Sequence, residues 1–379
     1  MDASQANQPF YFRFCLSLLS LGLLIVGVIM GKEILIPILF AILLATLLLP
    51  FTNFLVRKGF HKILSIALPV LATLLIVAGV LYFLTSQVIN FLDDAPALKE
   101  RVGEVSKSFQ SWVNENAHVT VKKQNEYIKN TLEDMKDQGP SIIGKTFGSF
   151  AGVLTYVLLL PIYTFLILYY RRTIKKFLIA VFRKGPDEEI SEILTQSSSI
   201  AQKYVTGLLI ETTIVFALNT TGFLILGIKY AIFLALLAAL LNLIPYVGML
   251  VANVFCMVVT LVSSDNTSDA LWVGIVLAVV QFIDNNFTMP LIVGNKVRIN
   301  ALVTIIGVLV GGTLAGIPGM FLAIPGLAVL KVIFDKVPQL NPWGLLLGDD
   351  SPGEDLKKDK SKASSIFSKR KMKTKTVNV

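Results

Sequence analysis

The chain has 379 residues, of which 54% are hydrophobic and 16% charged, and its formal net charge at pH 7 is +9. Soluble domains usually carry about a quarter charged residues, so this composition excludes a soluble protein with one large core. The charges sit in short clusters between long uncharged runs, as a bilayer requires, because a charge at its centre costs several kcal/mol. We therefore predict an all-α, polytopic membrane protein, with the lipid bilayer as its first partner.

The basic excess does not indicate nucleic-acid binding. Much of it lies beside an apolar run, in 171–176, or in the tail 357–375, where it suits membrane topology and contact with anionic lipids. The two cysteines lie inside apolar runs, the two histidines are far apart, and the sequence has no HExxH, CxxC or GxxxxGKS/T pattern. We expect no nucleic-acid partner, no metal, no cofactor and no enzymatic activity.

Six runs have the length of a simple membrane crossing, which needs about 20 apolar residues. The first is interpreted as a retained helix rather than a removed signal peptide, because it has no clear small-residue cleavage site. The last two carry one acid each, Glu211 and Asp284, while the others are uncharged. The predicted spans are Phe14–Met30, Ile34–Val56, Ile63–Leu84, Phe147–Tyr170, Tyr204–Ile228 and Leu271–Gly294.

Two further uncharged runs, Tyr230–Ser264 and Ile299–Leu330, are too long for one simple crossing. A straight helix of that length would exceed the hydrocarbon core by about 20 Å. Proline and glycine interrupt both runs, so we predict that each is a helical hairpin that enters and leaves on one side. A kinked full crossing remains the alternative for each, and with the hairpins the protein has about eight spans.

The predicted organisation has five parts. They are the first three spans (1–84), a small extracytoplasmic helical segment (85–146), the fourth span with a basic cytoplasmic helix (147–203), a transport region with two broken-helix units (204–334), and a basic, disordered cytoplasmic tail (335–379). Basic residues follow the second and fourth spans, so the positive-inside rule places both termini in the cytoplasm.

The strongest candidate for chemistry is Asp284, near the middle of the last span. At helical spacing Gln281, Asp284, Asn285 and Thr288 share one face, which lipid cannot solvate. Such a cluster predicts a substrate, cation or proton site. The alternative is an interhelical hydrogen-bond cluster that only holds the bundle together.

Other polar and helix-breaking residues extend this candidate pathway. Glu211 lies about two turns inside the fifth span, where it either contributes to the site or, being close to the cytoplasmic end, reaches water or pairs with Lys203. Asn242 precedes a proline break, and broken helices expose backbone groups and dipole ends to a ligand. The predicted pathway residues are Asp284, Asn285, Gln281, Asn242, Glu211, Asn286 and Thr288. The predicted gating residues are Pro245, Gly248, Pro290, Gly311, Gly312, Gly316, Pro318, Gly319 and Pro325.

Three motifs carry a resemblance to a known family. They are Leu241-Asn-Leu-Ile-Pro-Tyr-Val-Gly248, then Gln281-Phe-Ile-Asp-Asn-Asn with Pro290 and Gly294, and Gly311-Gly-Thr-Leu-Ala-Gly-Ile-Pro-Gly319 running to Ala323-Ile-Pro325. Over roughly residues 37–337 the chain resembles the autoinducer-2 exporter (AI-2E) family. The resemblance implies a bacterial inner-membrane transporter with hairpins that forms homo-oligomers. Some members are linked to export of a quorum-sensing furanone, and others to sodium–proton exchange.

The chain departs from that family at two places. It has Asn300-Ala301 where members often carry His-Pro, so no imidazole role transfers. It also has Glu211 where many members have an uncharged residue.

We predict a secondary transporter or exporter of a small polar solute, autoinducer-2-like, or of an ion, across the bacterial inner membrane. A sodium (cation)/proton antiporter is the close alternative, with Asp284, alone or together with Glu211, as the titrating group. A non-transporting membrane scaffold or interaction protein is the alternative from another class, and an intramembrane enzyme is the weakest. No ATP-binding motif is present, so transport is expected to use an ion gradient or a downhill solute gradient.

Overall fold

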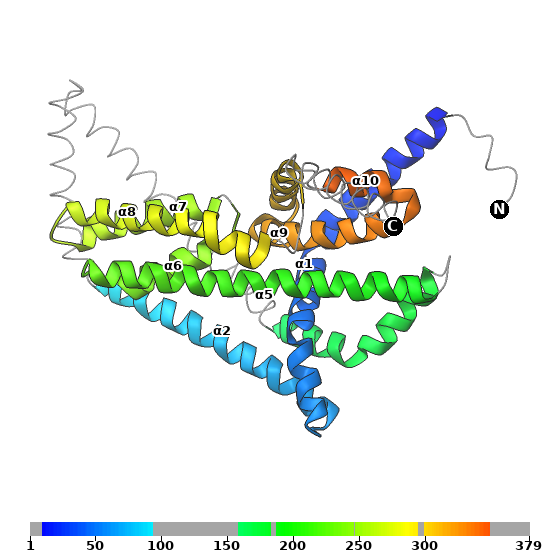
Figure 1. The fold of residues 1–379 in the computed structure, drawn as a ribbon, viewed down its shortest axis with the longest axis horizontal. Helices are drawn as coiled ribbons and strands as arrows, with labels where there is room; N and C mark the ends of the chain where they lie inside the picture. The colour runs from blue at the N-terminus through cyan, green and yellow to red at the C-terminus, as the bar shows by residue number, and fades with distance from the viewer. Residues whose placement is uncertain (1–9, 94–157, 183–186, 246, 295–298, 349–379) are drawn as a thin grey trace, which may run out of the picture.

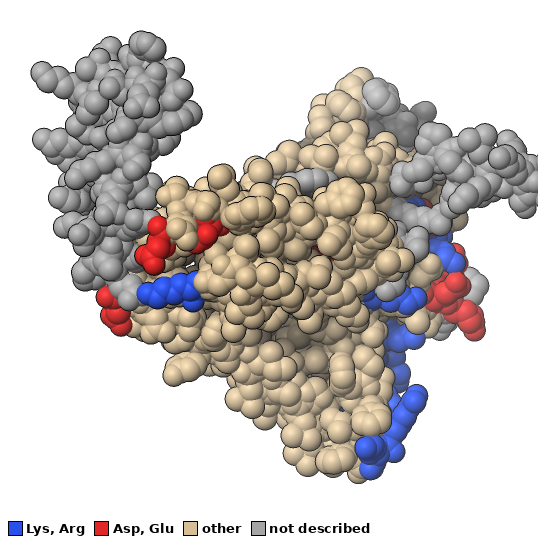
Figure 2. Space-filling model, turned by 60° about the vertical axis from the view of Figure 1, so that its left-hand side comes forward, with Lys and Arg blue, Asp and Glu red and all other residues tan. Residues whose placement is uncertain are grey.

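The computed structural model describes residues 10–93, 158–182, 187–245, 247–294 and 299–348 (Figure 1). Every regular element in these ranges is a helix. Five of the described helices are long and apolar enough to cross a membrane: Phe14–Arg57, Lys62–Phe91, Glu188–Ile225, Ser268–Ile292 and Ala301–Lys336. Figure 2 shows a broad face of uncharged side chains with the charged ones gathered toward its margins. The predicted polytopic helical membrane protein is confirmed.

The first two helices are joined by a turn and pack together near it, from which they diverge (Figure 1). Helix α1 (Phe10–Arg57) and helix α2 (Lys62–Asp93) are joined by a short turn at Gly59, whose φ of 89° favours glycine. Ala45 and Leu48 of α1 pack with Ile66 and Val70 of α2, and Leu168 of the helix over 158–181 completes this cluster. The remainder of the predicted fourth span, 147–157, lies outside the described residues.

Helix α1 differs from the prediction of two separate spans in 14–56. It is one continuous helix of 48 residues, about 72 Å long at 1.5 Å per residue. The predicted break at 31–33 is absent because Lys and Glu are good helix formers and one glycine costs only about 1 kcal/mol. Instead α1 changes direction along its length (Figure 1), and buried Pro37 lies inside it, where a proline bends a helix.

Helix α5 (Asp187–Ile225) is the central element and runs along the long axis of the molecule (Figure 1). It contacts α1 and the later helices α6, α8 and α9. Its buried positions recur at helical spacing, with Tyr204, Glu211, Val215 and Asn219 on one face. This face holds three polar side chains inside an otherwise apolar bundle.

The run 230–264 forms two helices that fold back on each other, as a hairpin requires, and entry and exit on one side of the membrane stays a prediction. Helix α6 (Ala231–Leu241) has 11 residues, about 16 Å, which is too short to cross a bilayer. Helix α7 (Val247–Ser263) returns beside it, and the Cys256 thiol lies 3.7 Å from the carbonyl oxygen of Leu234. Helix α8 (Ser268–Ile283) follows and packs on α7.

The second predicted hairpin run also reverses direction, and its placement on one side of the membrane stays a prediction. Helix α9 (Ala301–Lys336) is two helical arms joined at Gly316, whose φ of 64° and ψ of −148° lie outside the helical region. Glycine is needed where the arms cross, because a Cβ on Gly311 would overlap the backbone of Gly319, and the reverse also holds. Phe40 of α1 stacks on Phe321 of the second arm, with ring centroids 5.4 Å apart.

The prediction that the tail is disordered from 335 onward is wrong for its first residues. Helix α9 runs to Lys336, and a 3-10 turn (Pro338–Leu340) and helix α10 (Asn341–Leu347) follow it. The Asn300 N–H donates to the carbonyl oxygen of Leu347 at 3.0 Å, which ties α10 to the start of α9. Apolar side chains in 343–347 give this stretch a packing surface that the charge-rich sequence beyond it lacks. Residues 349–379, and 94–146 of the predicted extracytoplasmic segment, lie outside the described residues.

Candidate functional site

A cavity of about 410 Å³ lies where α5, the α6–α7 break, the end of α8 and the base of α9 meet. Its walls mix apolar side chains, including Leu208, Met249 and Ile324, with a concentrated group of polar ones. The polar lining residues are Tyr204, Glu211, Asn242, Gln281, Asp284, Asn285 and Thr304. Four elements far apart in the sequence therefore supply one site.

Asp284 lies at the point where α8 changes its hydrogen-bonding pattern. The chain continues α8 as two π-helical turns, Asp284–Thr288 and Pro290–Gly294. The Met289 N–H donates to the carbonyl oxygen of Asp284, five residues earlier, and Pro290 has no N–H with which to continue an α-helix. Isolated π-turns are frequent at functional sites. Sequence periodicity predicted a regular α-helix here and missed this widening.

The Asp284 carboxylate is only 2% exposed. Asn242 Nδ2 donates to its Oδ2 at 3.4 Å, which is a long hydrogen bond, and its Oδ1 has no hydrogen-bond partner within the described part of the chain. A buried carboxylate oxygen without a partner is costly, so the arrangement indicates a group that receives a proton, a water or a cation.

Glu211 faces the same cavity from α5 and is 7% exposed. Its carboxyl group lines the same cavity as that of Asp284, and the two groups interact electrostatically. The alternative of a pairing with Lys203 is not formed, because Lys203 lies on the exposed side of α5 while Glu211 lies on the buried side. Eight residues separate 203 from 211, and that spacing turns a helix by about 80°, which puts the two side chains on different faces.

The α6–α7 break places an amide beside the carboxylates. Asn242 is the C-cap of α6, and Pro245 lines the cavity in the short turn that follows. Gly248 allows this turn to close, because a Cβ there would overlap the carbonyl oxygen of Leu241. The break predicted from proline and glycine is therefore part of the cavity wall.

The remaining predicted pathway residues divide into two groups. Gln281 and Asn285 both line the cavity, and Gln281 Nε2 donates to Asn285 Oδ1 at 3.1 Å. Asn286 is exposed and donates to the carbonyl oxygen of Phe282, while Thr288 is buried without reaching the cavity lining. Helical geometry separates residue 286 from residue 284 by about 200°, so adjacency in sequence did not place them together.

The predicted gating residues of the last two elements do not form the cavity wall. The lining includes none of Pro290, Gly311, Gly312, Gly316, Pro318, Gly319 and Pro325. The α9 hairpin contributes instead through its base, with Ala301 and Thr304 in one arm and Ile324 in the other. Sequence reasoning missed Tyr204 and Thr304. The available signal for Tyr204 was its position seven residues before Glu211, which places both on one face of α5.

The electrostatic character of the cavity is acidic. Within the part of the chain that the structure describes, the lining has two carboxyl groups and no lysine, arginine or histidine. No group of three or more potential metal-ligating side chains occurs in the same described residues. The described lining of the site therefore has the charge to attract a cation.

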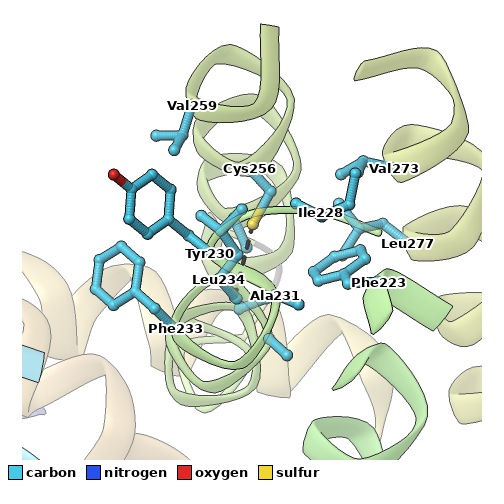
Figure 3. Close-up of a cluster of buried hydrophobic side chains, with 13 residues drawn as sticks. Phe223, Ile228, Tyr230, Ala231, Phe233, Leu234, Cys256, Val259, Val273 and Leu277 are labelled. Carbon is cyan, nitrogen blue, oxygen red and sulfur yellow. Dashed lines mark hydrogen bonds between the residues drawn. The ribbon is translucent and has the colours of Figure 1, made fainter. Parts of the chain in front are cut away.

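A buried apolar cluster fills the space between α5, α6, α7 and α8 and closes that part of the bundle (Figure 3). It combines Phe223 from α5, Leu234 from α6, Cys256 from α7 and Val273 from α8, each with no exposed surface. Figure 3 shows these side chains pointing toward one another between the helices. Asn285 and Met289, which also line the cavity, are exposed at the surface of the described structure.

Comparison with known proteins supplies the family. The family model described as "AI-2E family transporter" matches residues 18–339. YrrI of Bacillus subtilis (strain 168), named as a transport protein, is 28% identical over 309 residues, covering 80% of this chain and 86% of YrrI. YhhT of Escherichia coli (strain K12), also named as a transport protein, is 22% identical over 340 residues, covering 89% of this chain and 94% of YhhT. PerM of Escherichia coli (strain K12), named as a permease, is 26% identical over 215 residues, covering 55% of this chain and 60% of PerM.

The resemblance found from the sequence motifs is thus confirmed over most of the chain. The helical architecture, the multiple apolar helices and the family agree. This multi-pass membrane protein belongs to the AI-2E family of transporters.

Proposed function

We propose that this transporter exchanges a monovalent cation for protons at the Glu211–Asp284 pair. The observation that carries the proposal is the meeting of two carboxyl groups in one cavity whose described lining has no basic side chain. A neutral solute would not need two buried acids, whereas a cation and a proton can each neutralise such a pair.

The physical basis is repulsion between the two acids. Two unit charges about 4 Å apart repel by roughly 4 kcal/mol at an effective dielectric constant of about 20. An empty, doubly ionised pair is therefore unfavourable, and either a proton or a cation must be bound. Because the two ligands compete for the same oxygens, loading one releases the other, which is the condition for antiport.

A buried apolar barrier beside the cavity favours a carrier over an open channel. The cavity lining includes exposed Asn285, while the cluster around Phe223 and Leu234, reached past Asn242 and Gln281, is fully buried. A carrier must close one side while the other is open, and it exchanges its ligand by reversing that arrangement.

We place the protein in the bacterial inner membrane with both termini and the α1–α2 turn in the cytoplasm. The turn carries Arg57, Lys58 and Lys62. Arg171, from the basic cluster after the fourth predicted span, donates to Asn53 Oδ1 at 2.9 Å, so the two basic clusters meet at one end of the bundle. The positive-inside rule assigns such an end to the cytoplasm.

The test is cation–proton exchange by the full chain in proteoliposomes, with an internal pH dye and external Na⁺, Li⁺ or K⁺. Asp284→Asn and Glu211→Gln should each lower exchange by about tenfold or more, since each removes one of the competing charges. Cation affinity in the wild type should fall as the pH is lowered, because protons compete for the carboxylates. Glu192→Gln is the matched control on α5, because Glu192 is exposed and pairs with Lys336 at 2.8 Å, outside the cavity.

Two results would contradict the proposal. One is wild-type protein that neither binds nor exchanges any alkali cation at any pH between 6 and 9. The other is Asp284→Asn with the same exchange rate as Glu192→Gln. In the second case Asp284 would hold the helices together and would not carry the ligand.

A small polar solute is the second candidate, because of the cavity's size. A volume of about 410 Å³ exceeds the need of one ion, and the amides of Asn242, Gln281 and Asn285 offer both donors and acceptors. Efflux of a small hydroxylated furanone from loaded proteoliposomes tests this reading. Efflux by the wild type without any cation–proton exchange would favour it over antiport.

A further inference from the structure

A second, much smaller cavity lies deeper in the bundle, between α5, α6, α7 and α8. It shares Asn242, Met249 and Gln281 with the main cavity, so the two are neighbours across a common wall. On its other side, Ala238, Ala252 and Leu277 belong to the apolar cluster that closes the bundle. The small cavity thus lies between the carboxyl pair and the closed side.

Four carboxamide side chains line this small cavity, each from a different part of the fold. They are Asn219 of α5, Asn242 at the end of α6, Asn253 of α7 and Gln281 of α8. In the main cavity, the NH₂ group of Asn242 donates to Asp284 and that of Gln281 donates to Asn285. The amide oxygens of Asn242 and Gln281 remain as acceptors. Four such groups around one small space are unusual inside an apolar bundle, where amides are costly to bury.

Asn219 is the informative member of this group. It is 2% exposed, and its Oδ1 has no hydrogen-bond partner within the described residues. An amide that only tied two helices together would have its oxygen paired, since an unpaired buried acceptor costs about 1–3 kcal/mol. Its position two turns beyond Glu211, about 12 Å along α5, continues the line of polar side chains away from the main cavity.

The size of the space limits what it can hold. Its volume is about 10 Å³, compared with about 410 Å³ for the main cavity. About 10–15 Å³ is the smallest space that holds one water molecule. A dehydrated alkali cation fits within such a space, whereas a hydrated ion or an organic solute does not. Amide oxygens can replace part of an ion's hydration shell, as carbonyl oxygens do in selective filters.

We propose that the four carboxamides form a second binding site, for one dehydrated alkali cation on its way between the carboxyl pair and the closed side. This proposal rests on the proposed cation–proton exchange, and the second site adds a selectivity step to that exchange. Glu211 and Asp284 bind the cation by charge, and Asn219 with its neighbours determines by size which cations pass.

The test compares binding with passage, using the full chain. Equilibrium binding of ²²Na⁺ in detergent reports the carboxyl pair, and Li⁺, Na⁺ and K⁺ exchange in proteoliposomes reports passage. Asn219→Leu fills the space without an oxygen, and should lower Na⁺ exchange by about tenfold while Na⁺ binding stays within about twofold. Asn219→Ala enlarges the space, and should raise the ratio of K⁺ to Li⁺ exchange by several-fold.

Thr221→Val is the matched control, because Thr221 lies on the exposed side of α5 and its hydroxyl donates to the carbonyl oxygen of Ala217 at 2.8 Å. Thermal unfolding of each variant is recorded alongside. Unchanged exchange and unchanged cation ratios in both Asn219 variants would overturn the proposal. So would a drop in thermal stability with all three cations affected equally, which is the result of a purely structural role.

Failure of the underlying function gives a different result. If wild-type protein binds no ²²Na⁺, the carboxyl site itself is rejected and the small site falls with it. If the wild type binds ²²Na⁺ and Asp284→Asn does not, the carboxyl site stands, and the two Asn219 variants then decide the second site alone.

Discussion

The two broken-helix hairpins use their breaks in different ways. In the α6–α7 hairpin the break itself lines the cavity, with Asn242 and Pro245 in the wall. In the α9 hairpin the reversal at Gly316 is outside the cavity lining, and only the base of the two arms, at Thr304 and Ile324, reaches it. The first hairpin has a largely buried helix α6, whereas α9 has many exposed apolar side chains.

The difference shows what turns a break into a binding site. Both breaks release backbone groups from the helical pattern, but only the α6–α7 break meets polar side chains of other helices, Glu211 and Asp284. At the α9 crossing, Gly311 and Gly319 bring two backbones together instead, with no polar side chain between them. A broken helix thus indicates a binding site when the ends at the break face polar side chains of a neighbouring helix. Otherwise the break allows two helices to pack closely.

The largest expected effect is at Gly248. Gly248→Ala introduces a Cβ that overlaps the Leu241 carbonyl oxygen, so the turn that presents Asn242 and Pro245 cannot keep its form. We expect destabilisation of about 3 kcal/mol or more, together with loss of cation binding. Thermal unfolding in detergent and equilibrium ²²Na⁺ binding measure the two effects.

Gly326→Ala is the control for that change. A Cβ at Gly326 of α9 would meet nothing within 4 Å, so alanine should be neutral or stabilise the helix by up to about 1 kcal/mol. If Gly248→Ala unfolds at the same temperature as Gly326→Ala and binds Na⁺ normally, then the α6–α7 turn is not tightly constrained and the contrast between the hairpins disappears.

A smaller effect is expected at Gly319. Gly319→Ala forces the α9 arms apart at their crossing, since its Cβ would overlap the Gly311 backbone. The arms are exposed on their other sides and can separate, so we expect a loss of about 1–3 kcal/mol in stability. Cation affinity should remain within about twofold of wild type, because the crossing lies outside the cavity lining. A fall in affinity as large as that of Gly248→Ala would show that both breaks belong to the site.

Most of the architecture could be predicted from the sequence, because the bilayer imposes simple rules. Uncharged runs, proline and glycine breaks and basic clusters gave the spans and both hairpins, since each follows from helix length and the cost of charge in lipid. The continuity of α1 could not be predicted this way, because a Gly-Lys-Glu interruption looks like a loop but is compatible with a helix. The α10 helix was missed because it is short and lies beside a charge-rich tail.

The candidate site was predicted in part. One-dimensional helical spacing brought Gln281, Asp284 and Asn285 together correctly, because all three lie within one and a half turns of one helix. It could not show that Glu211 faces Asp284, because that contact depends on how α5 packs against α8 and the α6–α7 break. The π-turn at Asp284 likewise depends on local hydrogen bonding that apolar periodicity does not record.

Asn286 gives the smallest expected effect and tests how far sequence adjacency can be relied on. Although it follows Asp284 by only two residues, it is exposed and its amide donates to the carbonyl oxygen of Phe282 at 2.8 Å. Asn286→Ala should therefore change cation exchange and stability by no more than about 0.5 kcal/mol. Its matched partner Asn285→Ala removes a cavity amide that accepts from Gln281, and should weaken cation affinity several-fold. Equal losses in the two variants would mean that the cavity extends around the π-turn to the exposed face, so that the site includes the whole polar segment 284–286.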